Sequence, residues 1–410
     1  MSHHPWKMTP LVLLFTPCLL ATEKPLNYEL VITHDDTVRD SVVIDPTECR
    51  FCTYCSPLKG DAVDDSVQLI ELRRIWRPQP DDPLKSLTFT DLQRWNHRFY
   101  YTIRQAEGHG GLGVINILSS ETAVHWRQDA LIELKGYDLR DPKLSVTPDN
   151  HLMITTVMVN RQGGDWTHQS ITFHSEDGRQ WEGPFQVGPR NLWLWRTTWY
   201  KGIAYNIAQR TNNRFTEESF RDSFVRLYTS TDGKQFETLV DRMYANPDEG
   251  HGTEHDFVFF PDDTAFCLLR RDAQTVVGHD YAMLGTAQPP YTDWKWKKMD
   301  VKIGGPEMIG LPDGRLLACV RRYVNDLQWY PCWVELGWID RESAVYTPCL
   351  RLPSFDDCSY AGSVWNNGFL WISYYSCHER GEGKADAYLA KICINGLESR
   401  KPVHEFRHEQ

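Results

Sequence analysis

Apolar and alternating runs of residues, separated by turn-forming residues, account for most of this chain, and helical periodicity is nearly absent. Such runs predict short β-strands. Six tight turns, each joining two apolar runs, recur at intervals of roughly 50–60 residues. They are Asn96-His97, Asp149-Asn150, Lys201-Gly202, Asp262-Asp263, Asp313-Gly314 and Asn367-Gly368. Gly and Asn tolerate the positive φ that tight hairpins need.

A second repeat has a similar period. Residues 175–181 (SEDGRQW) are echoed by residues 230–236 (STDGKQF), and a degenerate copy occupies residues 120–126 (SETAVHW). Four short strands per repeat make a propeller blade. Six hairpins therefore predict an all-β fold, a six-bladed β-propeller of four-stranded antiparallel blades.

Composition supports one large folded domain. The chain has 410 residues, of which 41% are hydrophobic and 12% aromatic, including 16 Trp. This composition excludes collagen, a coiled coil and a mainly disordered chain. We expect a signal peptide at 1–22, an N-terminal extension at 23–82, the propeller at 83–400 and a tail at 401–410.

The net charge of −11 makes non-specific binding to nucleic acid unfavourable, because phosphate contacts need a basic surface. No basic stripe is present. A protein of this charge that binds an acidic ligand must gather its arginines locally, in a pocket.

The amino terminus has the pattern of a secretory signal. Lys7 precedes an apolar run at residues 11–20 (LVLLFTPCLL), which is too short to span a bilayer. We expect a secreted or periplasmic protein with no membrane span. A mis-assigned start or a buried strand are the alternatives.

Eleven cysteines fit export only in part. Cys49, Cys52 and Cys55 have the C-x2-C-x2-C spacing of part of an iron–sulfur or zinc site, but a suitably spaced fourth ligand is absent. We therefore expect a disulfide or free thiols there, and no metal or cofactor. Cys267 and Cys319 lie in apolar runs and are expected in the core.

The S-x-D-G-x-x-W repeat resembles the Asp-box, or BNR repeat, of the sialidase superfamily, whose members are six-bladed propellers. The resemblance implies an exo-α-sialidase-like glycosidase. It also implies roles for three residues: Tyr360 as nucleophile, Glu254 as the base that activates it, and Arg270, on the same hairpin as Glu254, as a ligand of the substrate carboxylate. Arg321 aligns with Arg270 one repeat later.

The first repeat departs from the family pattern. Phe89-Thr90 stands where sialidases carry an arginine, so Arg104 or Arg140 is expected to supply that charge. Charged groups at the starts of inner strands should converge at the propeller axis, and on that ground Asp91 is the first choice for general acid and Asp141 the second.

Three further residues are candidates at the axis. Arg196 begins an inner strand and is expected to bind substrate, and Trp195 beside it could stack on a sugar ring. His109 lies on a Gly-rich loop that could overhang the pocket. Inter-blade ion pairs, core packing and an ordinary surface loop are the alternatives for the arginines, the aromatic residues and His109 respectively.

The chemistry of these residue types is consistent. Arginine binds carboxylates bidentately, so several around one pocket indicate an acidic sugar or glycan as partner. A neutral tyrosine avoids the repulsion between a carboxylate nucleophile and a substrate carboxylate. A polysaccharide lyase acting by β-elimination on uronic-acid polymers, with Tyr360 or His109 as base, and a non-catalytic sugar-binding propeller are the alternatives.

Overall fold

The computed structural model describes residues 28–45, 64, 66–210, 224–245, 250–273, 278–323, 332–381 and 383–397. The predicted signal peptide, the tail at 401–410 and the cluster of Cys49, Cys52 and Cys55 lie outside these residues.

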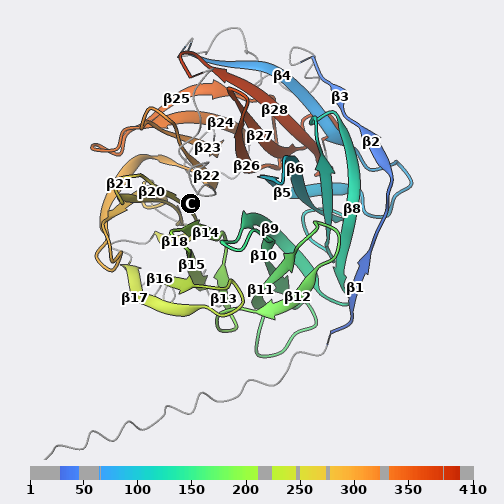
Figure 1. Ribbon diagram of the computed structural model, residues 1–410, viewed down its shortest axis with the longest axis horizontal. Helices are drawn as coiled ribbons and strands as arrows, with labels where there is room; N and C mark the ends of the chain where they lie inside the picture. The colour runs from blue at the N-terminus through green and yellow to red at the C-terminus, as the bar shows by residue number, and fades with distance from the viewer. Residues whose placement is uncertain are drawn as a thin grey trace, which may run out of the picture.

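Six antiparallel sheets surround a central axis and form a β-propeller, as predicted (Figure 1). The first three blades, each given from its innermost strand outward, are β5 (Ser86–Trp95), β6 (Arg98–Ala106), β7 (Val114–Ser120) and β8 (His125–Leu134); β9 (Asp138–Val146), β10 (Leu152–Val159), β11 (His168–Ser175) and β12 (Glu182–Gln186); and the interrupted inner strand β13 (Leu192–Leu194) and β14 (Thr198–Tyr200), with β15 (Ile203–Arg210), β16 (Phe224–Ser230) and β17 (Glu237–Ala245).

The last three blades follow the same order. They are β18 (His251–Phe259), β19 (Ala265–Asp272), β20 (Tyr281–Ala287) and β21 (Lys295–Lys302); β22 (Gly304–Gly310), β23 (Leu316–Tyr323), β24 (Cys332–Ile339) and β25 (Tyr346–Arg351); and β26 (Cys358–Asn366), β27 (Phe369–Ser376), β28 (Asp386–Ile394) and β4 (Val67–Trp76).

The N-terminal part of the chain closes the ring. Strand β4 pairs with β28 and supplies the outermost full strand of the sixth blade, so part of the segment 23–82 joins a blade. Strands β1 (Leu30–Thr33) and β2 (Val38–Asp40) extend the first blade along β8, and β3 (Val42–Val43) pairs with β4. The N-terminal segment therefore bridges the first and last blades on the outside of the ring.

Each of the six predicted turns joins the two innermost strands of a blade. Residues at these turns take positive φ, as at Asn96, Asn150 and Asn367. The residue types from which the blades were predicted therefore adopt the backbone conformation that these hairpin turns require.

The S-x-D-G turns share one set of hydrogen bonds. In the second blade the Gly178 amide donates to Ser175 Oγ at 2.8 Å, and two further amides donate to Asp177 Oδ1. Ser230 and Asp232 accept the same bonds in the third blade. A Cβ at Gly178 would overlap the ring of Tyr100 in the preceding blade, which explains the glycine there.

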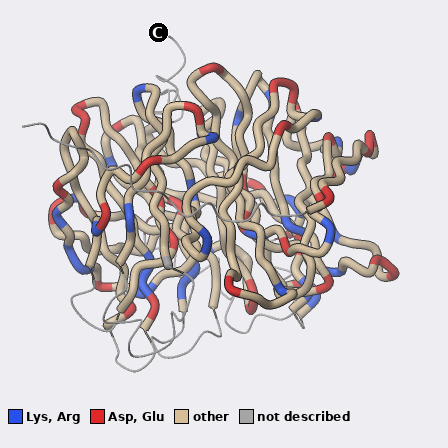
Figure 2. The backbone as a smooth tube through the Cα atoms, turned by 90° about the horizontal axis from the view of Figure 1, so that it is seen from below, with Lys and Arg blue, Asp and Glu red and all other residues tan. Residues whose placement is uncertain are grey.

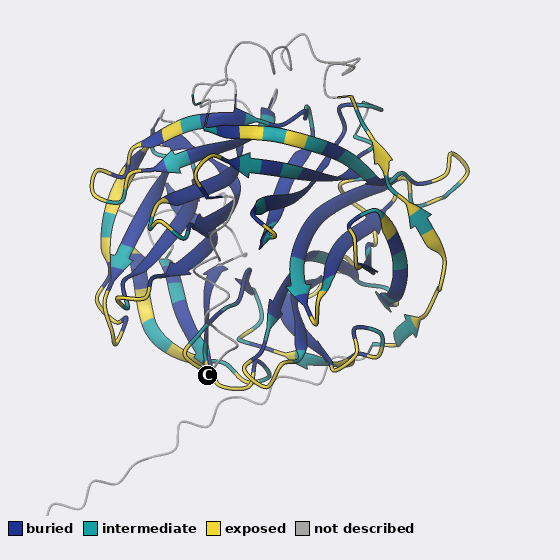
Figure 3. Cartoon of the chain, turned by 45° about the horizontal axis from the view of Figure 1, so that its top comes forward, coloured by how far each residue is buried: buried dark blue, intermediate teal, exposed yellow. Residues whose placement is uncertain are grey.

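Apolar cores lie between neighbouring blades, and exposed residues concentrate at turns and along outer strands (Figure 3). Cys267 and Cys319 are fully buried in these cores, as predicted. Acidic and basic residues are interspersed along the chain (Figure 2). None of the described residues belongs to a helix that could span a membrane.

Candidate functional site

The inner strands share an irregularity near their starts. The register shifts beside Phe89, Asp141, Glu254, Gly305 and Tyr360, each in a different blade. Four of the five take a positive φ: Phe89 (58°), Asp141 (52°), Gly305 (53°) and Tyr360 (52°). Bulges of this kind redirect side chains and are common beside functional sites. Trp195 holds the equivalent place in the third blade, where the inner strand is interrupted.

These six residues contact one another around the axis, and we call them the mouth ring. Tyr360 contacts the rings of Phe89 and Trp195, with centroids 5.0 and 5.8 Å away. Trp195 Nε1 donates to Asp141 Oδ2 at 3.0 Å. The Gly305 amide donates to Glu254 Oε2 at 2.8 Å.

The closest polar contact of the ring joins Tyr360 and Glu254. Tyr360 Oη donates to Glu254 Oε1 at 2.5 Å, and Arg270 Nη1 lies 2.7 Å from the same oxygen. All three side chains are buried. Burial opposes ionisation of Glu254, but the charge and hydrogen bond of Arg270 outweigh it and lower the pKa. Burial, and then the charge of Glu254, raise the pKa of Tyr360 well above its usual value. The pair is therefore a neutral phenol bonded to a carboxylate.

Two more guanidinium groups lie beside the ring. Arg321 packs over Tyr360 at 5.4 Å, and its Nη2 donates to Tyr375 Oη at 3.1 Å. Arg321 Nη1 makes no hydrogen bond to any residue that the structure describes. Arg140 packs over Phe89 at 4.8 Å and is partly exposed. Arg140, Arg270 and Arg321 thus give the mouth three positive charges in an acidic protein.

Asp141 is a buried carboxyl in the same ring. Its Oδ1 has no hydrogen-bond partner among the described residues, and burial raises its pKa. An unpaired carboxyl oxygen of this kind can serve a ligand, since burying it without a partner is costly.

A second ring lies deeper along the axis, and we call it the axial ion cluster. Asp91, Lys143, Asp256 and Glu307 each follow a mouth-ring residue by two positions, just beyond the shift in register. Arg196 lies at their centre. Its Nη2 is 3.2 Å from Asp91 Oδ1 and 2.7 Å from Glu307 Oε2.

This placement argues against two predictions. Asp91, expected as the general acid, is fully buried and accepts hydrogen bonds from the Leu144 amide and from Arg196. Arg196, expected to bind substrate, is held by carboxylates from three blades. The bulges account for the difference, because a shift in register means that strand positions matched by counting residues are not structurally equivalent.

The pKa values of several residues in the axial ion cluster are shifted. Burial raises the pKa of Asp256 to about 6 and that of Glu307 to about 8, and it lowers the pKa of Lys143 to about 8. Lys143 Nζ also lies 4.9 Å from the Trp195 ring and 5.5 Å from the Tyr360 ring. Lys143 thus connects the cluster to the mouth ring above it.

Arg104 is placed differently from the prediction as well. It is fully buried and pairs with Asp138 at 2.8 Å. Its guanidinium also donates to the carbonyl oxygens of Gly108, Gly110 and Gly111. The predicted substrate-binding arginine therefore holds the Gly-rich loop.

That loop carries His109, which contacts a mouth-ring residue. His109 Nδ1 lies 2.8 Å from Asp357 Oδ2, and its ring packs edge-on against Phe89 at 5.3 Å. Asp357 Oδ1 accepts from Tyr375 Oη at 2.8 Å. Sequence reasoning missed Lys143, Asp357 and Tyr375. Lys143 had a readable signal, since it follows Asp141 by two residues.

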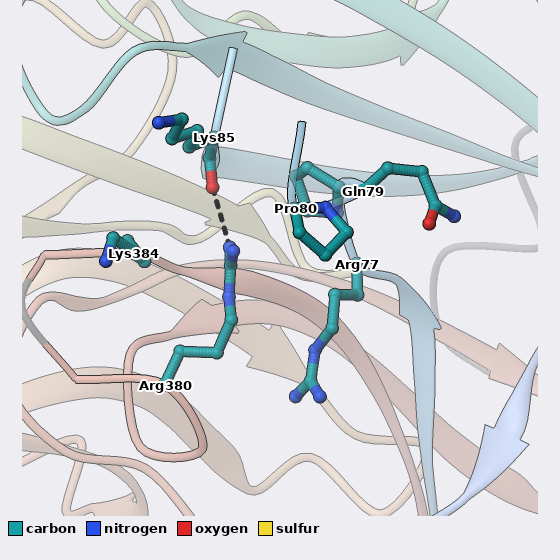
Figure 4. Close-up of a pocket in the computed structure, with 7 residues that line it drawn as sticks. Arg77, Gln79, Pro80, Lys85, Arg380 and Lys384 are labelled. Atoms are coloured by element: carbon teal, nitrogen blue, oxygen red, sulfur yellow. Dashed lines mark hydrogen bonds between the residues drawn. The ribbon is translucent and has the colours of Figure 1, made fainter. Parts of the chain in front are cut away.

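A cavity of about 390 Å³ lies elsewhere, between the sixth and first blades (Figure 4). Its basic lining is engaged by the protein itself: Arg380 donates to the carbonyl oxygens of Lys85 and Ala385, and Arg77 pairs with Asp386. None of its lining residues belongs to the mouth ring. In the described part of the chain no group of three or more His, Cys, Asp or Glu side chains is arranged to hold a metal ion.

Comparison with known proteins supports the fold. No family model and no curated protein sequence matches the chain. A protein of unknown function from Dyadobacter fermentans superposes with a TM-score of 0.65 at 16% identity, over 81% of this chain and 100% of the other. An α-L-arabinofuranosidase from Fusarium graminearum, bound to an iminosugar inhibitor, gives a TM-score of 0.60 at 12% identity, over 80% and 98%.

A sialidase from Trypanosoma rangeli is also similar, with a TM-score of 0.51 at 10% identity. The match covers 78% of this chain and 55% of the sialidase chain. At these identities the likeness concerns the propeller alone, because one fold hosts many functions. The activity has to be argued from the mouth ring.

Proposed function

We propose that this protein is a glycoside hydrolase of exo-α-sialidase type, which removes terminal acidic sugars from glycans. One observation carries the proposal: Tyr360 Oη donates to Glu254 Oε1 at 2.5 Å, and Arg270 lies on the same carboxylate oxygen. The structural neighbours that are named as glycosidases, a sialidase and an arabinofuranosidase, support it.

In this proposal Tyr360 is the nucleophile. An acidic sugar of the sialic type carries a carboxylate at its anomeric carbon, which would repel an anionic nucleophile. A neutral phenol avoids that repulsion until the moment of attack, when its proton passes to Glu254. The low pKa of Glu254 keeps it ionised and ready to accept that proton.

The arginines bind the substrate carboxylate. Arg140, Arg270 and Arg321 surround Tyr360 and Phe89, and a guanidinium binds a carboxylate through two parallel hydrogen bonds. Asp141 presents its unpaired Oδ1 to a polar group of the bound sugar. Trp195 packs against Tyr360 and forms an apolar wall of the site.

The proposal includes export. Lys7 and the apolar run at residues 11–20 form a signal peptide, which places the enzyme outside the cytoplasm with its glycan substrates. N-terminal sequencing of the protein recovered from the culture medium or periplasm tests this. A mature chain that still begins at Met1 would contradict it.

The activity is tested with three substrates: a 4-methylumbelliferyl α-sialoside, an aryl α-L-arabinofuranoside and a uronic-acid polymer. We expect fluorophore release from the sialoside alone. Absorbance of unsaturated ends from the polymer would replace the hydrolase with the lyase. Hydrolysis of the arabinofuranoside alone would remove the acidic sugar from the proposal. Binding without turnover of any substrate would leave a sugar-binding propeller.

A further inference from the structure

His109 and Asp357 form a dyad at the rim of the mouth. The pKa of Asp357 is lowered, because the hydrogen bond from His109 and the charges of His109 and Arg321 outweigh burial. Asp357 is therefore a carboxylate, which only accepts hydrogen bonds, so His109 Nδ1 carries the hydrogen between them. This leaves Nε2 as the reactive nitrogen. Nε2 makes no hydrogen bond to any residue that the structure describes.

The loop that carries His109 is held from beneath. The Arg104 guanidinium donates to three of its carbonyl oxygens, and Asp138 fixes Arg104 while accepting from the Gly113 amide at 3.0 Å. A Cβ at Gly113 would overlap the guanidinium, so the loop closes tightly over Arg104. Arg140 Nη2 adds a hydrogen bond to the His109 carbonyl oxygen. A buried ion pair thus holds an exposed imidazole in one place.

That place is separated from the nucleophile by the Phe89 ring and lies nearer to solvent. The rings of His109 and Tyr360 both pack against Phe89, at 5.3 and 5.0 Å. The His109 side chain is 53% exposed, whereas Tyr360 and Asp141 are 7% and 2% exposed. In an exo-acting hydrolase the terminal sugar is buried and the leaving group projects toward solvent. The group that protonates the leaving oxygen belongs at the rim.

We propose that His109, held by Asp357, is the general acid and base of the reaction. The inference rests on the proposed hydrolase function. Asp357 is a positioning residue, and Asp141, lower in the mouth ring, contacts the sugar and leaves the aglycone to His109.

The proton balance closes over two steps. First, with His109 in its imidazolium form, Tyr360 Oη bonds to the anomeric carbon and gives its proton to Glu254, while the glycosidic C–O bond breaks and the leaving oxygen takes the proton of His109 Nε2, which leaves His109 neutral. Second, Nε2 takes a proton from water, whose oxygen displaces the tyrosyl oxygen, and the phenolate recovers its proton from Glu254. The net change is addition of one water molecule across the glycosidic bond.

Leaving-group dependence tests the role. His109→Gln should lower kcat/KM for sialyllactose, whose sugar leaving group needs protonation, by about 10²–10⁴-fold. The same variant should lose less than about 10-fold on the 4-methylumbelliferyl sialoside, whose phenolate leaves without an acid. Asp357→Asn should also lower kcat/KM more for sialyllactose than for the 4-methylumbelliferyl sialoside. Equal losses on both substrates, or no loss, would overturn the proposal.

Two control variants separate the possible failures. His125, an exposed histidine paired with Asp40 at 2.6 Å, is a matched histidine–carboxylate pair on the outside of the first blade. His125→Gln should leave kcat/KM unchanged for both substrates. Tyr360→Phe should abolish the hydrolysis of both substrates equally. If Tyr360→Phe stays active while His109→Gln shows selective loss, the nucleophile assignment fails and the acid–base role stands. A wild-type protein that hydrolyses neither substrate overturns both.

Discussion

The mouth ring and the axial ion cluster use the same inner strands and similar residue types, but they differ in what their charges face. In the cluster, Arg196 is surrounded by Asp91, Asp256 and Glu307 from three blades. In the mouth ring, Asp141 Oδ1 has no hydrogen-bond partner in the described part of the chain, and Nη1 of Arg321, beside the ring, makes no hydrogen bond to the described residues. Charges that neutralise one another hold blades together. Charges left unsatisfied at an opening are available to a ligand.

The comparison predicts that substitutions in the mouth ring change activity without changing stability, whereas those in the cluster do the reverse. The largest expected effect is on turnover. Tyr360→Phe removes the oxygen proposed as nucleophile and should lower kcat by about 10³-fold or more. Hydrolysis of the aryl sialoside measures it, and urea unfolding checks that stability is kept.

Tyr374→Phe is the matched control for Tyr360→Phe. Tyr374 Oη donates to the Pro353 carbonyl oxygen, away from the mouth ring, so its loss should cost about 1 kcal/mol of stability and leave kcat unchanged. Full activity of Tyr360→Phe would place the mouth ring in the same structural class as the cluster and would end the comparison.

Arg196→Met tests the cluster directly. The substitution leaves three carboxyl groups buried with Lys143 as their remaining cation, and it should lower the free energy of unfolding by about 3–5 kcal/mol. Lys201→Met, which removes an exposed ion pair with Asp263, should cost at most about 1 kcal/mol. Equal costs in urea unfolding would show that the cluster contributes no more than a surface pair.

Arg270→Lys tests whether the guanidinium binds the substrate in addition to pairing with Glu254. A lysine keeps the charge but loses the fork that matches a carboxylate, so KM for the sialoside should rise about 10–100-fold. Arg315→Lys, in an exposed turn, should leave KM unchanged. An unchanged KM in Arg270→Lys would assign Arg270 to the support of Glu254 alone.

The smallest expected effect, when it is measured per pH unit, is a pH dependence of stability. The pKa of Glu307 is raised to about 8 from 4.5, so the folded state holds a proton that the unfolded state releases between these values. Stability should therefore fall as pH rises from about 4.5 to about 8. Glu307→Gln removes this contribution, which is at most about 1.4 kcal/mol per pH unit. Urea unfolding between pH 5 and 8 measures the slope.

Glu176→Gln, at an exposed carboxylate, is the control for Glu307→Gln and should reproduce the wild-type slope. Wild-type and Glu307→Gln curves that run parallel across this range would contradict a shared, partly protonated cluster.

The blades were predictable because turns carry their own chemistry. Asn96, Asn150 and Gly314 lie where φ must be positive, and their residue types predict that conformation. The proximity of Glu254, Arg270 and Tyr360 was predictable for a related reason. Equivalent positions of a repeat converge on the axis, whatever their separation in sequence.

Depth along the axis was not predictable. Phe89 and Asp91 both count as strand starts, and only a bulge, which leaves no mark in the hydrophobic pattern, decides which one reaches the mouth. The prediction that Arg104 binds substrate failed for a different reason. Its partner Asp138 lies on the next blade, so the sequence around Arg104 could not reveal that its charge is already neutralised.

The closure of the ring by β4 has a consequence for biosynthesis. This strand is synthesised before the inner strands of all six blades, but its partner β28 lies about 310 residues later. At about 5–20 residues per second, β4 waits roughly 15–60 s for its place in the sixth blade. Until then the growing chain exposes unpaired strand edges, and the sixth blade cannot be completed before β28 has been synthesised.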